Sequence, residues 1–369
     1  MRTLPRRLAV AIIVAVIVVF LSVKLNAFRD YQIAQIAVEV TAVAGISVLT
    51  GLSGQISLGH AAFMAIGAYT AALVLLHLNW PFYLVLVIAA AVTAVAGAVV
   101  GVAAARLHGP YLAGATLLLG IALPSLALAY PGTFGGEQGL NVIFTTPAFL
   151  GVNFPPTRWQ AWVCAAVALI VLVLLANLTQ SRIGRNWRAV RDNEVAAALD
   201  GINVAAARVR AFVVSAACAG LAGALLAVIT GTVAPGGFTL TLSIALLTAA
   251  VIGGLGSLPG ALWGSLVIVL VPTYVTDVAT SHGLSSTVGA NIPVAAYGVV
   301  LILVMLVFPH GIQGGLLRLI SAFLGPDQKS RIRRTALPRG GDPPGSPRDW
   351  GEAIPPGPPG SQHEKEGSA

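Results

Sequence analysis

The sequence predicts an all-α protein that crosses a membrane about ten times, and three observations support this prediction. Hydrophobic residues make up 57% of the chain and charged residues only 9%, whereas a soluble domain carries about 25% charged residues. The apolar residues come in long unbroken blocks, and a helix needs about 20 of them to span a bilayer. A strand barrel would instead show short alternating segments. The arginines gather between the blocks, which is typical of the ends of membrane spans.

Ten blocks are long and apolar enough to be spans. The first follows three arginines and has the outline of a signal peptide, but no small-residue cleavage site comes after it. We therefore expect it to be retained as a span. The second and eighth blocks are interrupted by glycine at one end. The predicted spans cover approximately residues 8–24, 32–50, 57–77, 82–105, 110–130, 159–178, 210–231, 240–256, 259–278 and 290–308.

The distribution of arginine predicts how the spans are oriented. Arginines near the N-terminus place that end in the cytoplasm, and six spans then place residues 178–209 on the same side. The loop 131–158 falls on the outer side and carries only Glu137 and Arg158 as charged residues. Ten spans return the C-terminus to the cytoplasmic side of a bacterial-type inner membrane. The cytoplasmic segment 178–209 holds the densest arginine group in the chain, namely Arg182, Arg185, Arg188, Arg191 and Arg208.

These patterns divide the chain into three parts. Residues 1–30 form the N-terminal end and the first span, and residues 31–318 form the transmembrane domain with a cytoplasmic loop at 179–209. Residues 319–369 are rich in proline and glycine, cannot bury a core, and are expected to form a disordered cytoplasmic tail. The tail begins with a basic cluster that either fixes the topology or contacts lipid headgroups or a partner: Lys329, Arg331, Arg333 and Arg334.

The formal net charge of +8 fits membrane topology and anionic lipid better than nucleic acid. The basic residues lie between apolar blocks, and no basic patch interleaved with aromatic residues accompanies them. Cys164 and Cys218 both lie in apolar stretches, where small buried hydrophobes are expected rather than a disulfide.

Residues 51–63 are the first of four unusual stretches. Four polar side chains and three glycines separate two apolar blocks there, and glycine allows the backbone to leave helical geometry. Non-helical backbone at membrane depth must be buried in protein or line a cavity, and a free helix start attracts a carboxylate. The stretch is therefore either a gate or solute contact in a translocation path, or a tight turn at the cytoplasmic face. The candidate path residues are Ser53, Gln55, Ser57 and His60.

The second stretch is the arginine-rich segment. Asp192 and Asn193 offer a helix cap, residues 194–199 favour a helix, and Gly201 stands where a left-handed residue would end it. The result is a short amphipathic helix, which either docks into a groove on another protein or lies on lipid and only sets the orientation. Three arginines recur every three residues and would share one helix face: Arg185, Arg188 and Arg191.

The third and fourth stretches are rich in glycine. In residues 253–264, glycines recur every four residues, which favours close helix packing over direct solute contact. Pro259 in this stretch fits the first turn of a helix. Residues 132–140 lie in the longest outer loop. They form either a plain loop or a contact with a solute-delivering partner.

Several motifs of energy coupling are missing. The sequence has no G-x-x-x-x-G-K-[ST] motif for binding and hydrolysing ATP. Proton or sodium coupling usually needs carboxylates or histidines within the spans, and carboxylates are nearly absent from them: Glu39 lies inside the second predicted span and Asp277 near the end of the ninth. We therefore expect no enzymatic activity, no catalytic residue, no metal site and no cofactor in this chain. The energy for transport would come from a separate protein.

At these stretches the sequence resembles the branched-chain amino acid permeases of ABC importers, and it looks closer to the M-type subunit. The resemblance covers roughly residues 30–318. It is carried, in order, by GLSGQISLGHAAFMAIGAYTAAL, SRIGRNWRAVRDNEVAAALDGIN, AFVVSAACAGLAGALLA, VIGGLGSLPGALWGSL and GVVLILVMLVFPHGIQGGL.

The resemblance implies an ABC importer fold and several partners. These are a second permease subunit in a homo- or heterodimer, two cytoplasmic ATPase subunits that bind ATP, a solute-binding protein and membrane lipid. The family's coupling pattern E-A-A-x-x-x-G is met with two departures. Val195 stands between the glutamate and the alanines, and Asp200 stands directly before the glycine, where an apolar residue is more usual. An alternative function is a stand-alone channel or facilitator for a small neutral solute such as urea or an amide. The residues expected to couple to the ATPase are Arg185, Arg188, Arg191, Glu194, Ala196, Ala197 and Gly201.

Overall fold

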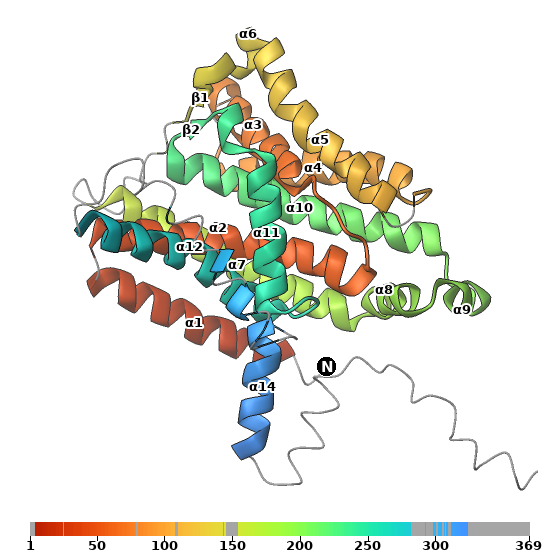
Figure 1. Cartoon of the computed structure of the whole chain (residues 1–369). Helices are drawn as coiled ribbons and strands as arrows, with labels where there is room; N and C mark the ends of the chain where they lie inside the picture. Colours follow the sequence, from red (N-terminus) through yellow and green to blue (C-terminus); the bar gives the residue numbers. More distant parts are fainter. Residues whose placement is uncertain are drawn as a thin grey trace, which may run out of the picture. The chain divides into compact units, whose positions relative to one another are not determined.

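A computed structural model of the chain gives a helical membrane domain. It describes residues 4–24, 26–78, 80–107, 110–142, 144, 154–281, 308 and 311–323, with isolated positions at 292, 298–299, 302–304 and 306. The chain divides into two compact units, Met1–Leu319 and Ile320–Ala369. Of the second unit, only residues 320–323 are described, as the last turn of a helix. The arrangement below is that of the first unit (Figure 1).

The described residues are almost all helical, as the sequence predicts. The long helices are α1 (Leu4–Lys24), α2 (Ala27–Ile46), α3 (His60–Leu78), α4 (Phe82–Ala104), α5 (Pro110–Ala129), α7 (Pro156–Gln180), α10 (Val204–Thr230), α11 (Leu240–Gly253), α12 (Leu258–Ser281) and α14 (Gly311–Phe323). Shorter helices are η1 (Ser47–Leu52), α6 (Pro131–Phe134), η2 (Gly136–Gln138), α8 (Arg182–Asp192), α9 (Glu194–Leu199) and η4 (Pro235–Gly237). Two short strands, β1 (Leu140–Asn141) and β2 (Thr232–Val233), pair antiparallel with Leu140 opposite Val233.

Nine of the ten predicted spans coincide with helices. Eight helices in the described part of the chain are long and apolar enough to cross a membrane, and α1 covers the first predicted span. The tenth predicted span, 290–308, lies largely outside the described residues.

The second predicted span begins five residues too late, because the helix already starts at Ala27. Its first turn holds charges that the prediction left outside. Those charges have partners: Arg158 stands 3.5 Å from Asp30, and Arg29 donates a hydrogen bond to Gln32 at 3.1 Å.

The centre of the domain is formed by α2 and α10. In the most apolar stretch of these spans 78% and 72% of the residues are buried, compared with 22% for α5 and 28% each for α4, α7 and α12. Figure 1 shows α10 running between α2, α3 and α4, and these helices are its main neighbours.

The central helices approach one another closely at glycines. A Cβ atom at Gly67 of α3 would overlap the carbonyl oxygen of Gly220, and a Cβ at Gly223 would overlap that of Met64.

The glycine-rich loop after α5 is structured. It forms α6, η2 and β1, and Gly135 and Gly139 take the left-handed backbone conformation with φ angles of +76° and +71°. A Cβ atom at Gly139 would overlap the carbonyl oxygen of Val233. The ring of Phe134 packs edge-on against that of Tyr69 at 5.1 Å. The loop is therefore fixed against α3 and the β2 region.

Candidate functional site

The first part of the candidate site is a break between α2 and α3. Helix α2 continues into the π-helical turn η1, and π turns are frequent at functional sites. The chain leaves helical geometry after Ser53, with Gly54 at a φ of +72°, and α3 begins at His60. The ring Nε2 of His60 lies 3.2 Å from the carbonyl oxygen of Ala42. Residues 53–59 therefore run back beside the second half of α2, at a depth inside the span.

The four candidate path residues are all buried in the protein. The side chain of Ile56 is 51% exposed and Gly54 is also exposed, so the extended segment turns one face inward and the other outward. The inward face carries the polar side chains and the outward face carries the apolar one. Exposed fractions of the four polar residues are 4% for Ser53, 5% for Gln55, 2% for Ser57 and 1% for His60.

Polar contacts fasten this segment to several helices. The side-chain amide of Gln55 donates to Ser53 Oγ at 2.7 Å and to the carbonyl oxygen of Arg208 at 3.3 Å. The backbone N–H of Leu58 donates to Thr116 Oγ1 of α5 at 3.0 Å. The N–H of Ala61 donates to Ser243 Oγ of α11 at 2.9 Å. These N–H groups at the start of α3 are already occupied, so they are not available to a solute carboxylate.

The second part of the site is the segment from Ser181 to Asn203, which contains α8 and α9. Ser181 caps α8, because its hydroxyl accepts a hydrogen bond from the N–H of Ile183 at 3.2 Å. Trp187 is fully buried, and its indole N–H donates to the carbonyl oxygen of Ala207 at 3.0 Å. This side chain anchors α8 against the first turn of α10.

The three predicted arginines of α8 reach the C-terminal ends of other helices. Arg185 donates to the carbonyl of Gln180 at 3.2 Å and Arg188 to that of Thr179 at 3.0 Å, both at the end of α7. Arg191 donates to the carbonyl of Gly51 in η1 at 2.7 Å. A cation is stabilising at a helix C-terminus, where carbonyl groups are unpaired and the dipole is negative. These arginines therefore tie α8 to two membrane helices.

The predicted short helix is confirmed as α9, together with its cap and its end. Asn193 Oδ1 accepts a hydrogen bond from the N–H of Ala196 at 3.0 Å. Ala197 is buried. Gly201 is left-handed with a φ of +79°, and the next N–H returns to the carbonyl of Ala197 at 3.0 Å, as in a Schellman end. Glu194 forms an ion pair with Arg208 of α10 at 2.7 Å.

The sequence reasoning missed two residues of α9. Val195 and Leu199 are 70% and 83% exposed, and their spacing of four places them on one helix face. Exposed apolar side chains at a polar end of a protein indicate an interaction surface. The signal is present in the sequence, because these are the two large apolar residues of α9, whose other residues are a glutamate and alanines. The comparison with the family pattern marks Val195 only as a departure and does not indicate that it is exposed.

The glycine-rich turn between α11 and α12 joins the two parts of the site. A Cβ atom at Gly51 would overlap the backbone nitrogen of Gly256, and one at Gly253 or Gly264 would overlap backbone of the same hairpin. This confirms the prediction that residues 253–264 serve close packing. The turn after α11, the end of η1 and Arg191 of α8 therefore meet at one place.

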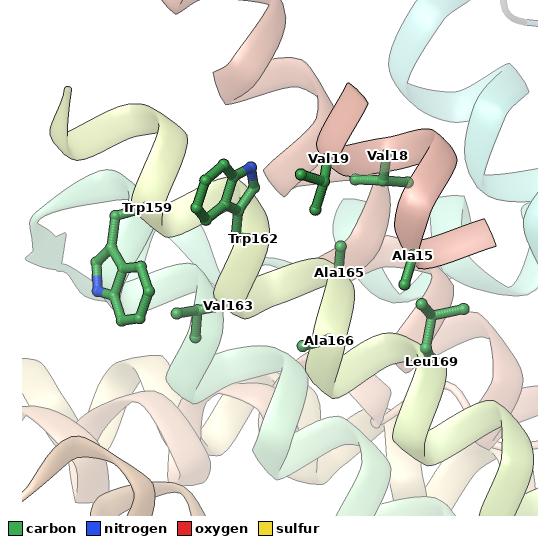
Figure 2. A pocket seen from close by; sticks show the side chains of 9 residues that line it. All are labelled: Ala15, Val18, Val19, Trp159, Trp162, Val163, Ala165, Ala166 and Leu169. Carbon is green, nitrogen blue, oxygen red and sulfur yellow. The ribbon is translucent and has the colours of Figure 1, made fainter. Parts of the chain in front are cut away.

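One pocket of the structure lies elsewhere. It has a volume of about 320 Å³ between α1 and α7 (Figure 2). Apolar side chains line it, which suits hydrocarbon and offers no charged partner to a polar solute. The pocket lining consists of Ala15, Val18, Val19, Trp159, Trp162, Val163, Ala165, Ala166 and Leu169.

The two cysteines, Cys164 and Cys218, are free and buried. Within the described residues, no group of three His, Cys, Asp or Glu side chains is placed to hold a metal ion.

Comparison with known proteins gives one family. The model of the branched-chain amino acid transport system permease component matches residues 28–309. The high-affinity branched-chain amino acid transport system permease protein LivM of Salmonella typhimurium is 35% identical over 236 residues, which cover 58% of this chain and 55% of LivM. LivM of Escherichia coli gives the same values. LivH of Salmonella typhimurium is 36% identical over 159 residues, which cover 43% of this chain and 48% of LivH.

The matched region is longer for LivM than for LivH, as the predicted resemblance to the M-type subunit requires. The chain spans about half the length of the curated relatives it matches. No solved structure matches it.

Proposed function

Because the chain belongs to the family of branched-chain amino acid transport permeases, we propose that it is one membrane-spanning subunit of an ABC importer for branched-chain or related amino acids. The family model covers residues 28–309. In this proposal a second permease subunit completes the translocation path, and two ATPase subunits bind ATP. A solute-binding protein delivers the amino acid on the opposite side of the membrane. The choice of solute rests on the names of the relatives.

The observation that carries the proposal is the exposed apolar face of α9. Val195 and Leu199 project from a short helix that is held from three sides. Trp187 anchors the preceding helix, the Asn193 cap fixes the start of α9, and Glu194 pairs with Arg208. A rigid helix with an apolar face fits into a groove on a partner protein. We assign that partner as an ATPase subunit, and residues 179–209 as the coupling segment.

Two chains of contact connect the coupling segment to the broken segment 53–60. The guanidinium of Arg191 binds the carbonyl of Gly51 at the end of η1. The carbonyl of Arg208, whose side chain pairs with Glu194, accepts a hydrogen bond from Gln55. A displacement of α8 and α9 by the ATPase would therefore move both ends of this connection together. We propose that the broken segment is the moving element of the translocation path.

Within the broken segment, the two faces have different proposed roles. Gln55 and His60 hold the segment to the carbonyl groups of Arg208 and Ala42 from the inside. Ser53 and Ser57, also on the inside, accept hydrogen bonds from within the segment. The exposed side, with Gly54 and Ile56, faces the path shared with the second permease subunit. An apolar surface there suits a branched aliphatic side chain, which is the distinguishing part of the proposed solutes.

The proposed orientation follows from the charges. The end of the domain that carries α8 and α9 faces the cytoplasm, since the arginine group lies there and arginine is enriched on that side. Arg7 of α1 binds at the same end, where it donates to the carbonyl of Ala176 in α7 at 2.8 Å. The N-terminus is then cytoplasmic. The C-terminal part, residues 319–369, lies outside the described residues apart from the end of α14 and is proposed to be a cytoplasmic tail.

Reconstitution tests the overall proposal. The chain is placed in liposomes with its second permease subunit, with and without the two ATPase subunits. We expect uptake of leucine from the loaded binding protein only when the ATPase subunits and ATP are present. Leucine or urea flux at full rate without ATPase or ATP would overturn the proposal and favour a channel.

The docking role of α9 is tested at Leu199. We expect Leu199→Arg to abolish co-purification of the ATPase subunits while membrane insertion is unchanged, because the side chain is 83% exposed and supports nothing inside the fold. Leu199→Met keeps the apolar surface and nearly the same volume, so it should retain the ATPase. Equal co-purification of both variants would show that α9 is not the docking element.

The connection through Arg191 is tested by separating docking from transport. Removing a hydrogen bond from a charged group costs about 1.5–3 kcal/mol. We expect Arg191→Met to lower ATP-dependent leucine uptake about tenfold or more, while the ATPase subunits still bind. Arg191→Lys keeps a cation near the Gly51 carbonyl and should recover part of the uptake. Normal uptake by the methionine variant would remove Arg191 from the mechanism.

A further inference from the structure

Glu39 is a carboxylate in the centre of the most buried span, and the mechanism above does not use it. It stands at the middle of the 26-residue span Ala27–Leu52. Its side chain is 7% exposed, and its Oε2 atom has no hydrogen-bond partner among the described residues. Ionisable groups at this depth are expensive and usually mark a solute or ion pathway. Buried polar groups in proteins are nearly always hydrogen-bonded, so this unpartnered oxygen calls for a partner from outside the chain.

A polar stripe leads along α2 to this carboxylate. Gln32 and Gln35 precede Glu39 with spacings of seven and four residues, which places all three on one helix face. Gln32 is buried and Gln35 is half-buried. About one and two turns beyond the carboxylate, Val43 and Ile46 are apolar, so the stripe ends at Glu39. The stripe therefore connects one end of the span with its middle, and that end is the one away from α8 and α9.

Helix α12 lies beside α2 (Figure 1), and it carries a second orphaned group. Arg29 of α2 donates to the hydroxyl of Tyr274 in α12 at 3.5 Å. Arg29 and Tyr274 therefore lie at about the same depth, and distances along both helices can be counted from them. Glu39 follows Arg29 by ten residues, and Ser265 precedes Tyr274 by nine. These separations correspond to about 15 Å and 14 Å along the two axes. The hydroxyl of Ser265 is fully buried and also has no partner among the described residues.

The groups around Glu39 indicate which kind of ligand this carboxylate can bind. A proton relay needs a second titratable group nearby, but the stripe continues with glutamines. Two ionisable residues that belong to or contact α2 are already engaged, His60 with the carbonyl of Ala42 and Asp30 with Arg158. A metal ion needs several ligands, and no group of three suitable side chains is found in the part of the chain that the structure describes. A single carboxylate with a hydroxyl at the same level suits an organic ammonium group.

We propose that Glu39 receives the α-ammonium group of the transported amino acid halfway across the membrane, with Ser265 supplying a hydroxyl beside it. This inference rests on the proposed function and names the chemistry by which the path recognises its solute. The polar stripe of Gln32 and Gln35 gives the zwitterion hydrogen-bonding groups on the way to that point. The branched aliphatic end of the solute needs only apolar surface.

The charge of Glu39 is tested in the complete reconstituted transporter. Glu39→Gln has the shape and hydrogen-bonding capacity of a neutral carboxyl group but cannot be an anion. We expect this variant to lower ATP-dependent leucine uptake about tenfold or more, with normal assembly and normal basal ATP hydrolysis. Glu39→Asp keeps the charge and should retain a larger share of uptake. Uptake by the glutamine variant equal to the wild type would overturn the ammonium site.

A second measurement does not depend on changing Glu39. Ser265→Cys is introduced together with Cys164→Ala and Cys218→Ala, and its alkylation by a maleimide is followed in the transporter during turnover with leucine. We expect leucine to slow the alkylation several-fold, because the solute would occupy the space beside residue 265. An unchanged rate would overturn the proposed position. ATP-driven uptake by the wild type in the same experiment shows separately whether the importer function itself holds.

Discussion

Helices α10 and α4 pack against each other and both contain a long apolar stretch, yet α10 is central and α4 is peripheral. The difference lies in where small side chains stand. Gly220 and Gly223 of α10 meet α4 and α3 on different sides. On α4, only the face that carries Gly97 and Gly101 meets α10, and its opposite face exposes valines such as Val95. Apolar content therefore identifies a span, and the placement of small residues identifies which sides have protein neighbours.

The largest effect is expected where two backbones touch in the central helices. Gly67→Leu would force a side chain into the carbonyl group of Gly220, which has no flexible atoms that can move aside. We expect a loss of at least about 3 kcal/mol, the upper range for overpacking. The measurement is the thermal unfolding midpoint and the yield of monodisperse protein in detergent.

The matched control lies on the peripheral helix α5. A Cβ atom at Gly114 meets nothing within 4 Å, so Gly114→Leu adds an apolar side chain that faces lipid. We expect no loss of stability, and a gain of up to about 1 kcal/mol from helix propensity. Equal destabilisation by the two leucines would show that the central and peripheral helices do not differ in packing as the structure has them.

A medium effect is expected where the coupling segment is held by a hydrogen bond instead of by close backbone packing. Trp187→Phe keeps most of the buried ring but removes the N–H that binds the carbonyl of Ala207, at a cost of about 1–2 kcal/mol. We expect faster amide hydrogen exchange in α8 and α9 and lower leucine uptake, with little change in the membrane core.

Trp263 provides the control for this change. Its indole N–H also donates a hydrogen bond, to Gln313 Oε1 at 3.0 Å, but it belongs to α12 and its partner lies outside the coupling segment. We expect Trp263→Phe to leave hydrogen exchange in α8 and α9 as it is. If both variants loosened the coupling segment equally, the anchor would not be specific to Trp187.

The sequence predicts the spans and the coupling helix because their signals are local. The caps of α9 and its glycine end follow each other within nine residues, and each apolar block is continuous. The contact between Arg191 and Gly51 joins positions 140 residues apart, so no local pattern contains it. The inward face of Ser53, Gln55 and Ser57 could not be predicted for a similar reason. Polar alternation shows that two faces differ, but the position of neighbouring helices decides which one is buried.

The same limit explains the start of α2. Arg29 and Asp30 looked like loop residues, because charges are unfavourable inside an apolar span. In the folded domain Arg158 and Gln32 stand close to them, so the first turn can remain helical. The sequence also does not predict the π turn η1, since most of its six residues continue the apolar block of the second predicted span.

The smallest effect is expected at a glycine of the coupling segment, which is needed for a different reason from those of the core. Gly201 has a φ of +79°, and a Cβ atom there meets nothing within 4 Å. Gly201→Ala therefore creates no overlap and costs only the left-handed conformation, about 1 kcal/mol. Asparagine tolerates this conformation better, so Gly201→Asn should lie closer to the wild type. Hydrogen exchange at the end of α9 measures the order glycine, asparagine, alanine. If alanine were as disruptive here as leucine is at Gly67, steric closeness would govern both regions, and the contrast between the coupling segment and the central helices would fail.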